Sequence, residues 1–186
     1  MNLPNKITTF RVILIPFFVF FMLSYTVPHT RLIALVIFVA ASCSDFLDGY
    51  LARKYHLVTN FGKFMDPLAD KLLVCAALIC FVSSGQLSAW VGILIISREF
   101  IVTGFRLIAA EQGVVIAASY WGKFKTTAQM IMSILLIIDR DAAWFVWLSR
   151  FFIWAAVILT VISMVDYIYK NIDVLKEKEG KEADER

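Results

Sequence analysis

Charged residues are scarce in this sequence: Asp, Glu, Lys and Arg make up 18% of its 186 residues, whereas soluble globular proteins contain about 25%. Hydrophobic residues make up 60%, against a usual share of roughly 45–50%. A soluble domain of this length could not bury so much apolar surface, and a disordered chain has the opposite composition. The scarcity of charge therefore indicates an integral membrane protein.

Cysteine and glycine are also few, with 3 and 8 residues. An odd number of cysteines (Cys43, Cys75 and Cys80), all within apolar stretches, argues against a disulfide framework, and the composition excludes a collagen-like fibre. No basic stripe interleaves with aromatic residues, so the net charge of +3 does not indicate a nucleic-acid partner. The absence of an internal repeat disfavours a transporter built from duplicated halves.

Long apolar stretches are what the sequence has instead. A helix needs roughly 20 residues to cross a membrane. Six stretches approach or exceed that length, at 7–27, 32–52, 62–82, 89–110, 121–138 and 142–169. The sequence therefore predicts an all-α integral membrane protein with six transmembrane helices. They form one membrane domain, residues 1–169, which a charged cytoplasmic tail, residues 170–186, follows.

Basic residues are divided unevenly between the two sides of such a bundle. The short connections 27–31, 83–88 and 139–141 share one side. Of the 18 Lys and Arg, only three fall there: Arg31, Arg140 and Arg150. Because cytoplasmic loops carry the excess of basic residues, we expect a multi-pass protein of the plasma membrane with both termini in the cytoplasm. Most spans turn polar toward that end, which predicts a polar cavity at the cytoplasmic side.

Four aspartates stand at helical spacing in the polar halves of the second and third stretches: Asp45, Asp48, Asp66 and Asp70. Four carboxylates cannot all stay ionised near a membrane without a counter-charge. Mg²⁺ or Mn²⁺ suits such an all-oxygen site, whereas no Cys or His has the ligand spacing that zinc requires. The pattern therefore predicts a divalent-cation site between two helices.

Small residues accompany the aspartates. At about 100° per residue, Gly49, Ala52 and Arg53 share an arc with the first two aspartates, and Gly62 shares a stripe with the other two. Gly49 and Ala52 would leave a shelf for a large ligand, and Arg53 offers a guanidinium fork to a phosphate. We expect Pro67 in the first turn of the third helix, where its missing N–H is harmless.

The stretch from Asp45 to Asp70 resembles the signature of the CDP-alcohol phosphatidyltransferase family. That signature reads D-x-x-D-G-x-x-A-R, eight residues, then G-x-x-x-D-x-x-x-D, and every position is filled here. Segments 2–11, 97–100 and 122–126 resemble a bacterial subgroup whose acceptor alcohol is sn-glycerol 3-phosphate. The resemblance covers nearly the whole chain apart from the tail.

The resemblance implies a reaction in which CDP-diacylglycerol donates its phosphatidyl group to an alcohol and CMP leaves. It also implies a site at the cytoplasmic membrane boundary, a pair of divalent ions and a homodimer. In such a site the metals would bind Asp45, Asp48 and Asp66. Asp70 would help to hold the second ion and accept the proton of the attacking hydroxyl. The donor nucleotide would bind Gly49, Ala52, Arg53 and Gly62. No Ser–His or Cys–His pair accompanies the motif, which favours direct attack.

A phosphorylated acceptor requires cations, because a carboxylate-lined cavity repels a dianion. The cations available in the polar halves of the fourth and fifth stretches are Arg98, Arg106, Lys123 and Lys125, and we expect them to bind the acceptor phosphate. The alternative for Arg98 is that Glu99, the next residue, simply neutralises it. Lys123 and Lys125 are two residues apart, so at most one of them points straight inward.

The sequence leaves two alternative functions open. Within the family, the acceptor could be inositol phosphate, serine or a phosphatidylglycerol, which the core motif does not distinguish. A divalent-cation transporter would also place carboxylates in membrane spans, but it needs polar residues that continue to the outer face. The outer halves of the first, third and fourth stretches hold essentially no acids or bases, so the transporter is less favoured.

Overall fold

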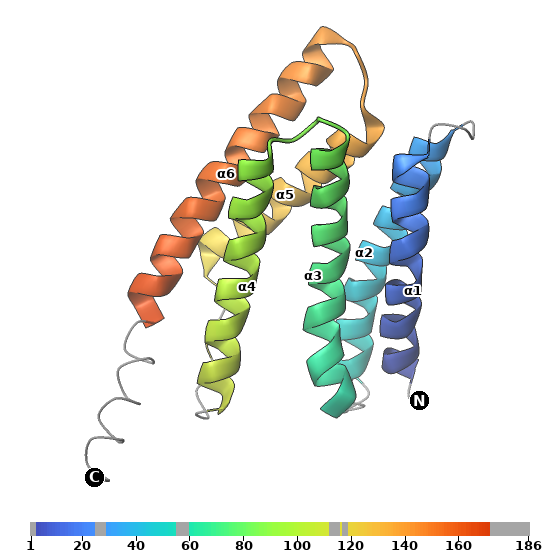
Figure 1. Cartoon of the computed structure of the whole chain (residues 1–186). Helices are drawn as coiled ribbons and strands as arrows, with labels where there is room; N and C mark the ends of the chain where they lie inside the picture. The colour runs from blue at the N-terminus through green and yellow to red at the C-terminus, as the bar shows by residue number, and fades with distance from the viewer. Residues whose placement is uncertain (1–2, 25–28, 55–59, 112–115, 117–118, 172–186) are drawn as a thin grey trace. The chain divides into compact units, whose positions relative to one another are not determined.

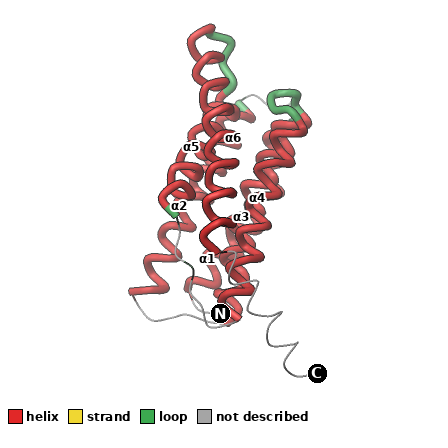
Figure 2. Tube along the Cα trace, turned by 90° about the vertical axis from the view of Figure 1, so that its left-hand side faces the viewer, coloured by secondary structure: helices red, strands yellow, loops and turns green. Residues whose placement is uncertain are grey.

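A computed structural model of the chain shows six α-helices (Figure 1), and no strand occurs among the residues that it describes (Figure 2). These residues are 3–24, 29–54, 60–111, 116 and 119–171, and the description leaves out the side chains of 3–7, 45–54, 60–67, 70 and 111. The helices are α1 (Leu3–Leu23), α2 (Thr30–Lys54), α3 (Asn60–Ser83), α4 (Ala89–Glu111), α5 (Tyr120–Ile138) and α6 (Ala143–Asn171). The all-α fold class is thereby confirmed.

Helix boundaries agree with the apolar stretches except at the first helix. The other five helices begin and end within about two residues of the predicted limits, but α1 begins and ends four residues early, at Leu3 and Leu23. Pro4 explains the early start, since proline fits the first turn of a helix. The expectation for Pro67 was wrong: α3 begins at Asn60, which puts Pro67 in its interior.

Only α6, among the described residues, is long and apolar enough to cross a membrane by length and composition. Shorter apolar stretches cover Thr8–Leu23, Thr30–Ser44 and Lys71–Ser83. All six helices nevertheless expose large apolar side chains, for example Phe17, Val36, Ile79, Ile93, Phe124 and Trp147. Such a surface is unusual for a soluble monomer. The six-span topology stays a prediction.

The chain divides into two compact units, which are described separately. Unit 1 comprises residues 1–92 and 133–140, and unit 2 comprises residues 93–132 and 141–186. In unit 1, α1 packs along both α2 and α3 (Figure 1). The rings of Phe18 on α1 and Phe38 on α2 lie 5.7 Å apart and are fully buried. Their packing fixes the two helices against each other.

Two contacts join three chain segments at one end of unit 1. Arg31, at the start of α2, forms an ion pair with Asp139, just after α5. Gln86, between α3 and α4, donates a hydrogen bond of 3.0 Å from its side-chain amide to the carbonyl of Leu136. Asp139 has a left-handed backbone, with φ of 45°, as is common for the residue that ends a helix. These segments thus meet at one end, as the sequence predicts for the short connections.

In unit 2, α6 turns a partly polar face inward. Its buried residues include Ala156, Thr160, Ser163 and Tyr167, spaced three or four apart, so they form one stripe along the helix. The ring of Phe105 on α4 meets Tyr167 edge-on, with centroids 6.2 Å apart. Hydroxyl groups therefore lie in the interior of unit 2, where polar side chains from α4 and α5 can reach them.

Candidate active site

The acidic signature occupies two successive helices of unit 1. Asp45 and Asp48 lie on the continuous helix α2, three residues apart, and Asp66 and Asp70 lie on α3, one turn apart. Both helices pack against α1. Each pair therefore has the helical spacing from which its ligand role was predicted, although the side-chain geometry of all four aspartates lies outside the described residues.

The donor set fits a hard divalent cation. The predicted ligands are carboxylates on helices of one compact unit, and oxygen is the ligand atom that Mg²⁺ and Mn²⁺ prefer. Among the side chains that are described, no group of three or more His, Cys, Asp or Glu could hold a metal ion. The side chains of the signature aspartates are not among those described, and these aspartates remain the predicted ligands.

The predicted donor-binding residues follow on the same two helices. Gly49, Ala52 and Arg53 lie on α2, and Gly62 lies in the first turn of α3. A glycine inside a helix is unfavourable by roughly 0.5–1 kcal/mol relative to alanine. Gly49 therefore destabilises α2. A ligand that approaches the backbone closely at this position would explain why a glycine is present. The side chains of Ala52 and Arg53 lie outside the description.

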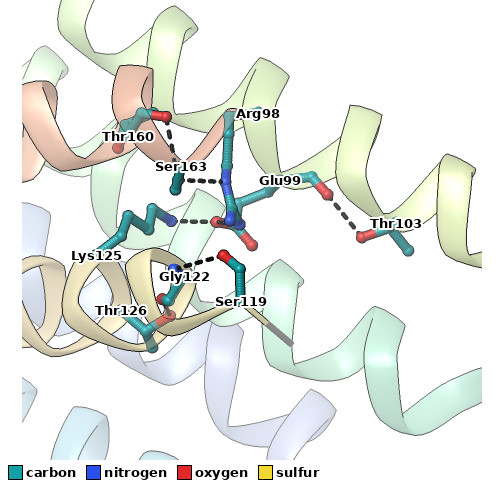
Figure 3. Close-up of polar contacts among 9 residues, drawn as sticks. All are labelled: Arg98, Glu99, Thr103, Ser119, Gly122, Lys125, Thr126, Thr160 and Ser163. Atoms are coloured by element: carbon teal, nitrogen blue, oxygen red, sulfur yellow. Dashed lines mark hydrogen bonds and ion pairs between the residues drawn. The ribbon is translucent and has the colours of Figure 1, made fainter. Parts of the chain in front are cut away.

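A second polar site, the Glu99 cluster, consists of Arg98, Glu99, Lys125 and Ser163 in unit 2 (Figure 3). The ammonium of Lys125 on α5 donates to Oε1 of Glu99 on α4. Nη1 of Arg98 lies 3.3 Å from the same oxygen. One carboxylate thus binds two cations from neighbouring helices, and the three charged groups carry a net charge of +1.

Ser163 on α6 binds a second nitrogen of the Arg98 guanidinium. Nε of Arg98 donates to Oγ of Ser163 at 3.2 Å, and that hydroxyl donates to the carbonyl of Thr160 at 3.1 Å. Lys125 is 1% exposed and Arg98 is 7% exposed, so both cations lie in an environment where electrostatic interactions are stronger than in water. The two cations and the carboxylate therefore form one buried network of charges that joins α4, α5 and α6.

Gly122 makes room for this arrangement at the start of α5. A Cβ atom at Gly122 would lie 3.4 Å from Nη2 of Arg98, at the tight limit of van der Waals contact. Its backbone N–H donates to Oγ of Ser119 at 3.2 Å, and a serine in that position caps a helix N-terminus. The segment 122–126, singled out in the sequence, thus supplies both the space beside Arg98 and the buried Lys125.

The four predicted acceptor cations do not all come together. Arg98 and Lys125 meet at Glu99, whereas Lys123 and Arg106 are exposed. The Lys123 ammonium lies over the ring of Tyr120, 5.5 Å from its centroid, and the Arg106 guanidinium lies 5.9 Å from the ring centroid of Tyr167. As the two-residue spacing predicts, only one of the two lysines points inward, and it is Lys125.

Sequence reasoning missed Ser163 and recognised only half of the role of Glu99, which binds Lys125 as well as Arg98. The signal for Ser163 was a polar stripe within the apolar sixth stretch, where Thr160, Ser163 and Tyr167 recur at helical spacing. Such a stripe indicates a helix face that contacts polar groups of its neighbours.

Comparison with known proteins identifies the family. Residues 1–162 match the profile described as CDP-alcohol phosphatidyltransferase. A CDP-diacylglycerol–glycerol-3-phosphate 3-phosphatidyltransferase of Bacillus subtilis is 46% identical over 94% of this chain and 97% of its own length. The protein of that name from Haemophilus influenzae is 42% identical, with coverages of 90% and 91%. A probable phosphatidylglycerophosphate synthase of Mycobacterium tuberculosis is 39% identical, with coverages of 92% and 82%. The chain therefore belongs to the CDP-alcohol phosphatidyltransferase family.

Proposed function

We propose that this protein transfers the phosphatidyl group of CDP-diacylglycerol to sn-glycerol 3-phosphate, giving phosphatidylglycerophosphate and CMP in phospholipid biosynthesis. The observation that carries the proposal is the complete signature on α2 and α3, in a chain that matches the family over residues 1–162. The names of the similar proteins from Bacillus subtilis and Haemophilus influenzae support the choice of acceptor.

Asp45, Asp48, Asp66 and Asp70 would together bind two Mg²⁺ or Mn²⁺ ions. Bound divalent ions neutralise the donor diphosphate and stabilise the departing CMP. Asp70 also accepts the proton of the acceptor hydroxyl. The hydroxyl oxygen then forms a bond to the phosphatidyl phosphorus while the bond from that phosphorus to the CMP oxygen breaks. Gly49, Ala52, Arg53 and Gly62 receive the nucleotide, with Arg53 at its phosphates.

The Glu99 cluster is the site for the acceptor phosphate. Arg98 and Lys125 bring two buried cations together at one carboxylate, and cations attract an incoming dianion. Arg106 and Lys123 are exposed and attract the anion from solution over a longer range. This division of roles gives the buried pair the larger share of acceptor affinity, because exposed charges are screened by salt.

The membrane arrangement follows from composition and charge. All six helices span the plasma membrane, residues 1–169 form the membrane domain, and the tail, residues 170–186, lies in the cytoplasm with the N-terminus. A polar cavity at the cytoplasmic side admits the water-soluble acceptor, while the acyl chains of the donor stay in the bilayer. The protein works as a homodimer. The exposed apolar side chains of all six helices support burial in lipid.

Single cysteines test this orientation. Cys43, Cys75 and Cys80 are first replaced by alanine, and Ser88 or Tyr120, both exposed, is changed to cysteine. A maleimide that does not cross membranes should label Ser88→Cys in intact cells and Tyr120→Cys only after the cytoplasmic face is opened, because basic residues favour the cytoplasmic side. The opposite pattern would contradict the orientation and put the nucleotide site in the wrong compartment.

An acceptor panel tests the function directly. Purified protein is incubated with CDP-diacylglycerol, Mg²⁺ and one candidate alcohol, and CMP release is measured. With sn-glycerol 3-phosphate, release should be at least about tenfold faster than with serine, which lacks the phosphate that a charged contact would bind, and it should also be faster than with inositol phosphate or phosphatidylglycerol. Faster release with another alcohol would replace the acceptor. Movement of Mn²⁺ into vesicles without CMP release would support a transporter instead.

A further inference from the structure

Arg11 on α1 is fully buried and is the largest of the completely buried side chains described. Its Nε donates a hydrogen bond of 3.2 Å to the backbone carbonyl of Ala41 on α2, the helix that lies beside α1 in unit 1 (Figure 1). A guanidinium stays charged at any ordinary pH. The interior of unit 1 therefore contains a permanent positive charge, to which the proposed mechanism assigns no role.

A buried guanidinium needs a counter-charge as well as hydrogen bonds, because hydrogen bonds to neutral groups do not fully compensate the loss of hydration of a charge. The acidic residues within 1–92 are Asp45, Asp48, Asp66 and Asp70, all of them in the signature. The remainder of unit 1, residues 133–140, adds only Asp139, which forms an ion pair with Arg31. The available counter-charge for Arg11 within unit 1 is therefore the signature itself.

The backbone places the hydrogen bond of Arg11 close to Asp45 along α2. Ala41 precedes Asp45 by four residues on a continuous helix, so the carbonyl that Arg11 binds belongs to the turn leading into Asp45. One helical turn rises about 5.4 Å. The backbone of Asp45 therefore lies one turn from the carbonyl that Arg11 binds, and opposite charges attract strongly in a protein interior.

From this placement we infer that Arg11 is the permanent counter-charge of the acidic signature and a positioning residue for Asp45. It offsets carboxylate repulsion when no metal is bound, and its bond to Ala41 fixes α1 on the turn before Asp45. The role of these carboxylates as metal ligands rests on the proposed function, but the pairing of charges does not.

A double-mutant cycle in metal-free, detergent-solubilised protein tests the pairing. Arg11→Met should lower the thermal midpoint by on the order of 10 °C, as expected for breaking a buried charge pair. In an Asp45→Asn background the same change should cost less than about half as much, because the partner charge is already gone. Arg11→Lys, which keeps the charge, should restore most of the midpoint. If Arg11→Met does not fold, recovery of folded protein in the double variant supports the pairing.

The ion pair of Arg31 and Asp139 provides matched controls. The effect of Arg31→Met should be small from the outset and smaller still in an Asp139→Asn background, whereas the effect of Arg11→Met should be the same there as in the wild type. An Arg11→Met effect that is equal in the wild-type and Asp45→Asn backgrounds would overturn the inference, as would a double variant that remains unfolded, since both would assign Arg11 to packing alone.

Manganese gives a second readout. Arg11 and a divalent ion are attracted by the same carboxylates, so Mn²⁺ should raise the midpoint of Arg11→Met by more degrees than that of the wild type. An equal or smaller rise would contradict the counter-charge role. A wild type that does not respond to Mn²⁺ would contradict the proposed metal site, while the metal-free cycle would still decide the role of Arg11.

Discussion

Asp66→Asn is expected to reduce turnover by on the order of a thousandfold or more, and saturating Mg²⁺ or Mn²⁺ should not restore it. An amide oxygen is neutral, so asparagine can occupy the position without supplying the charge that a hard cation requires. Asp45→Asn should behave in the same way. The measurement is CMP release from CDP-diacylglycerol in the presence of sn-glycerol 3-phosphate, over a titration of metal concentration.

The matched control for this substitution is Asp139→Asn, in the same compact unit. Asp139 is paired with Arg31 at a partly exposed position, where an ion pair contributes little, and the variant should turn over near the wild-type rate. Near-normal activity of Asp66→Asn or Asp45→Asn would contradict the assignment of the signature to metal binding. Activity that high metal restores would indicate a weakened ligand rather than an essential one.

The helices were largely predictable because each of them largely coincides with a long apolar stretch of the sequence, and an apolar stretch of this length favours a helix over a strand. The limits of the apolar stretches therefore predict the helix ends within a few residues, as at α4 and α5. The rule failed where helix and apolar stretch do not coincide. At α1 the helix begins among polar residues, four residues before the predicted limit, and it ends four residues early. Hydropathy measures burial in lipid, whereas a helix start depends on local backbone bonding.

Spacing along one helix was equally predictable, but partners on different helices were not. The interval between Asp66 and Asp70 follows from helix geometry. By contrast, Lys125 is 26 residues from Glu99, and Ser163 is 65 residues from Arg98. Nothing in the order of the residues specifies which faces of α4, α5 and α6 pack together. The sequence therefore predicted a set of cations, and the structure was needed to select the pair that meets.

The meeting of Arg98 and Lys125 at Glu99 leads to a second prediction with a large effect. Lys125→Met should raise the KM for sn-glycerol 3-phosphate about ten- to hundredfold and leave the KM for CDP-diacylglycerol nearly unchanged. Methionine resembles lysine in length but carries no charge. A charge-assisted hydrogen bond contributes about 1.5–3 kcal/mol, and each 1.4 kcal/mol corresponds to a factor of ten. Titration of each substrate at saturating concentrations of the other measures the two constants separately.

Lys123→Met is the matched control, because it makes the same substitution two residues away on the same helix. Lys123 is exposed, and its ammonium lies over the ring of Tyr120, so its interaction with the dianion is screened and the acceptor KM should rise by less than about threefold. General destabilisation by Lys125→Met would not change one KM selectively. If the donor KM rises and the acceptor KM does not, the Glu99 cluster binds the donor diphosphate. The phosphorylated acceptor then loses its main physical support, because the two buried cations at Glu99 would already be occupied by the donor.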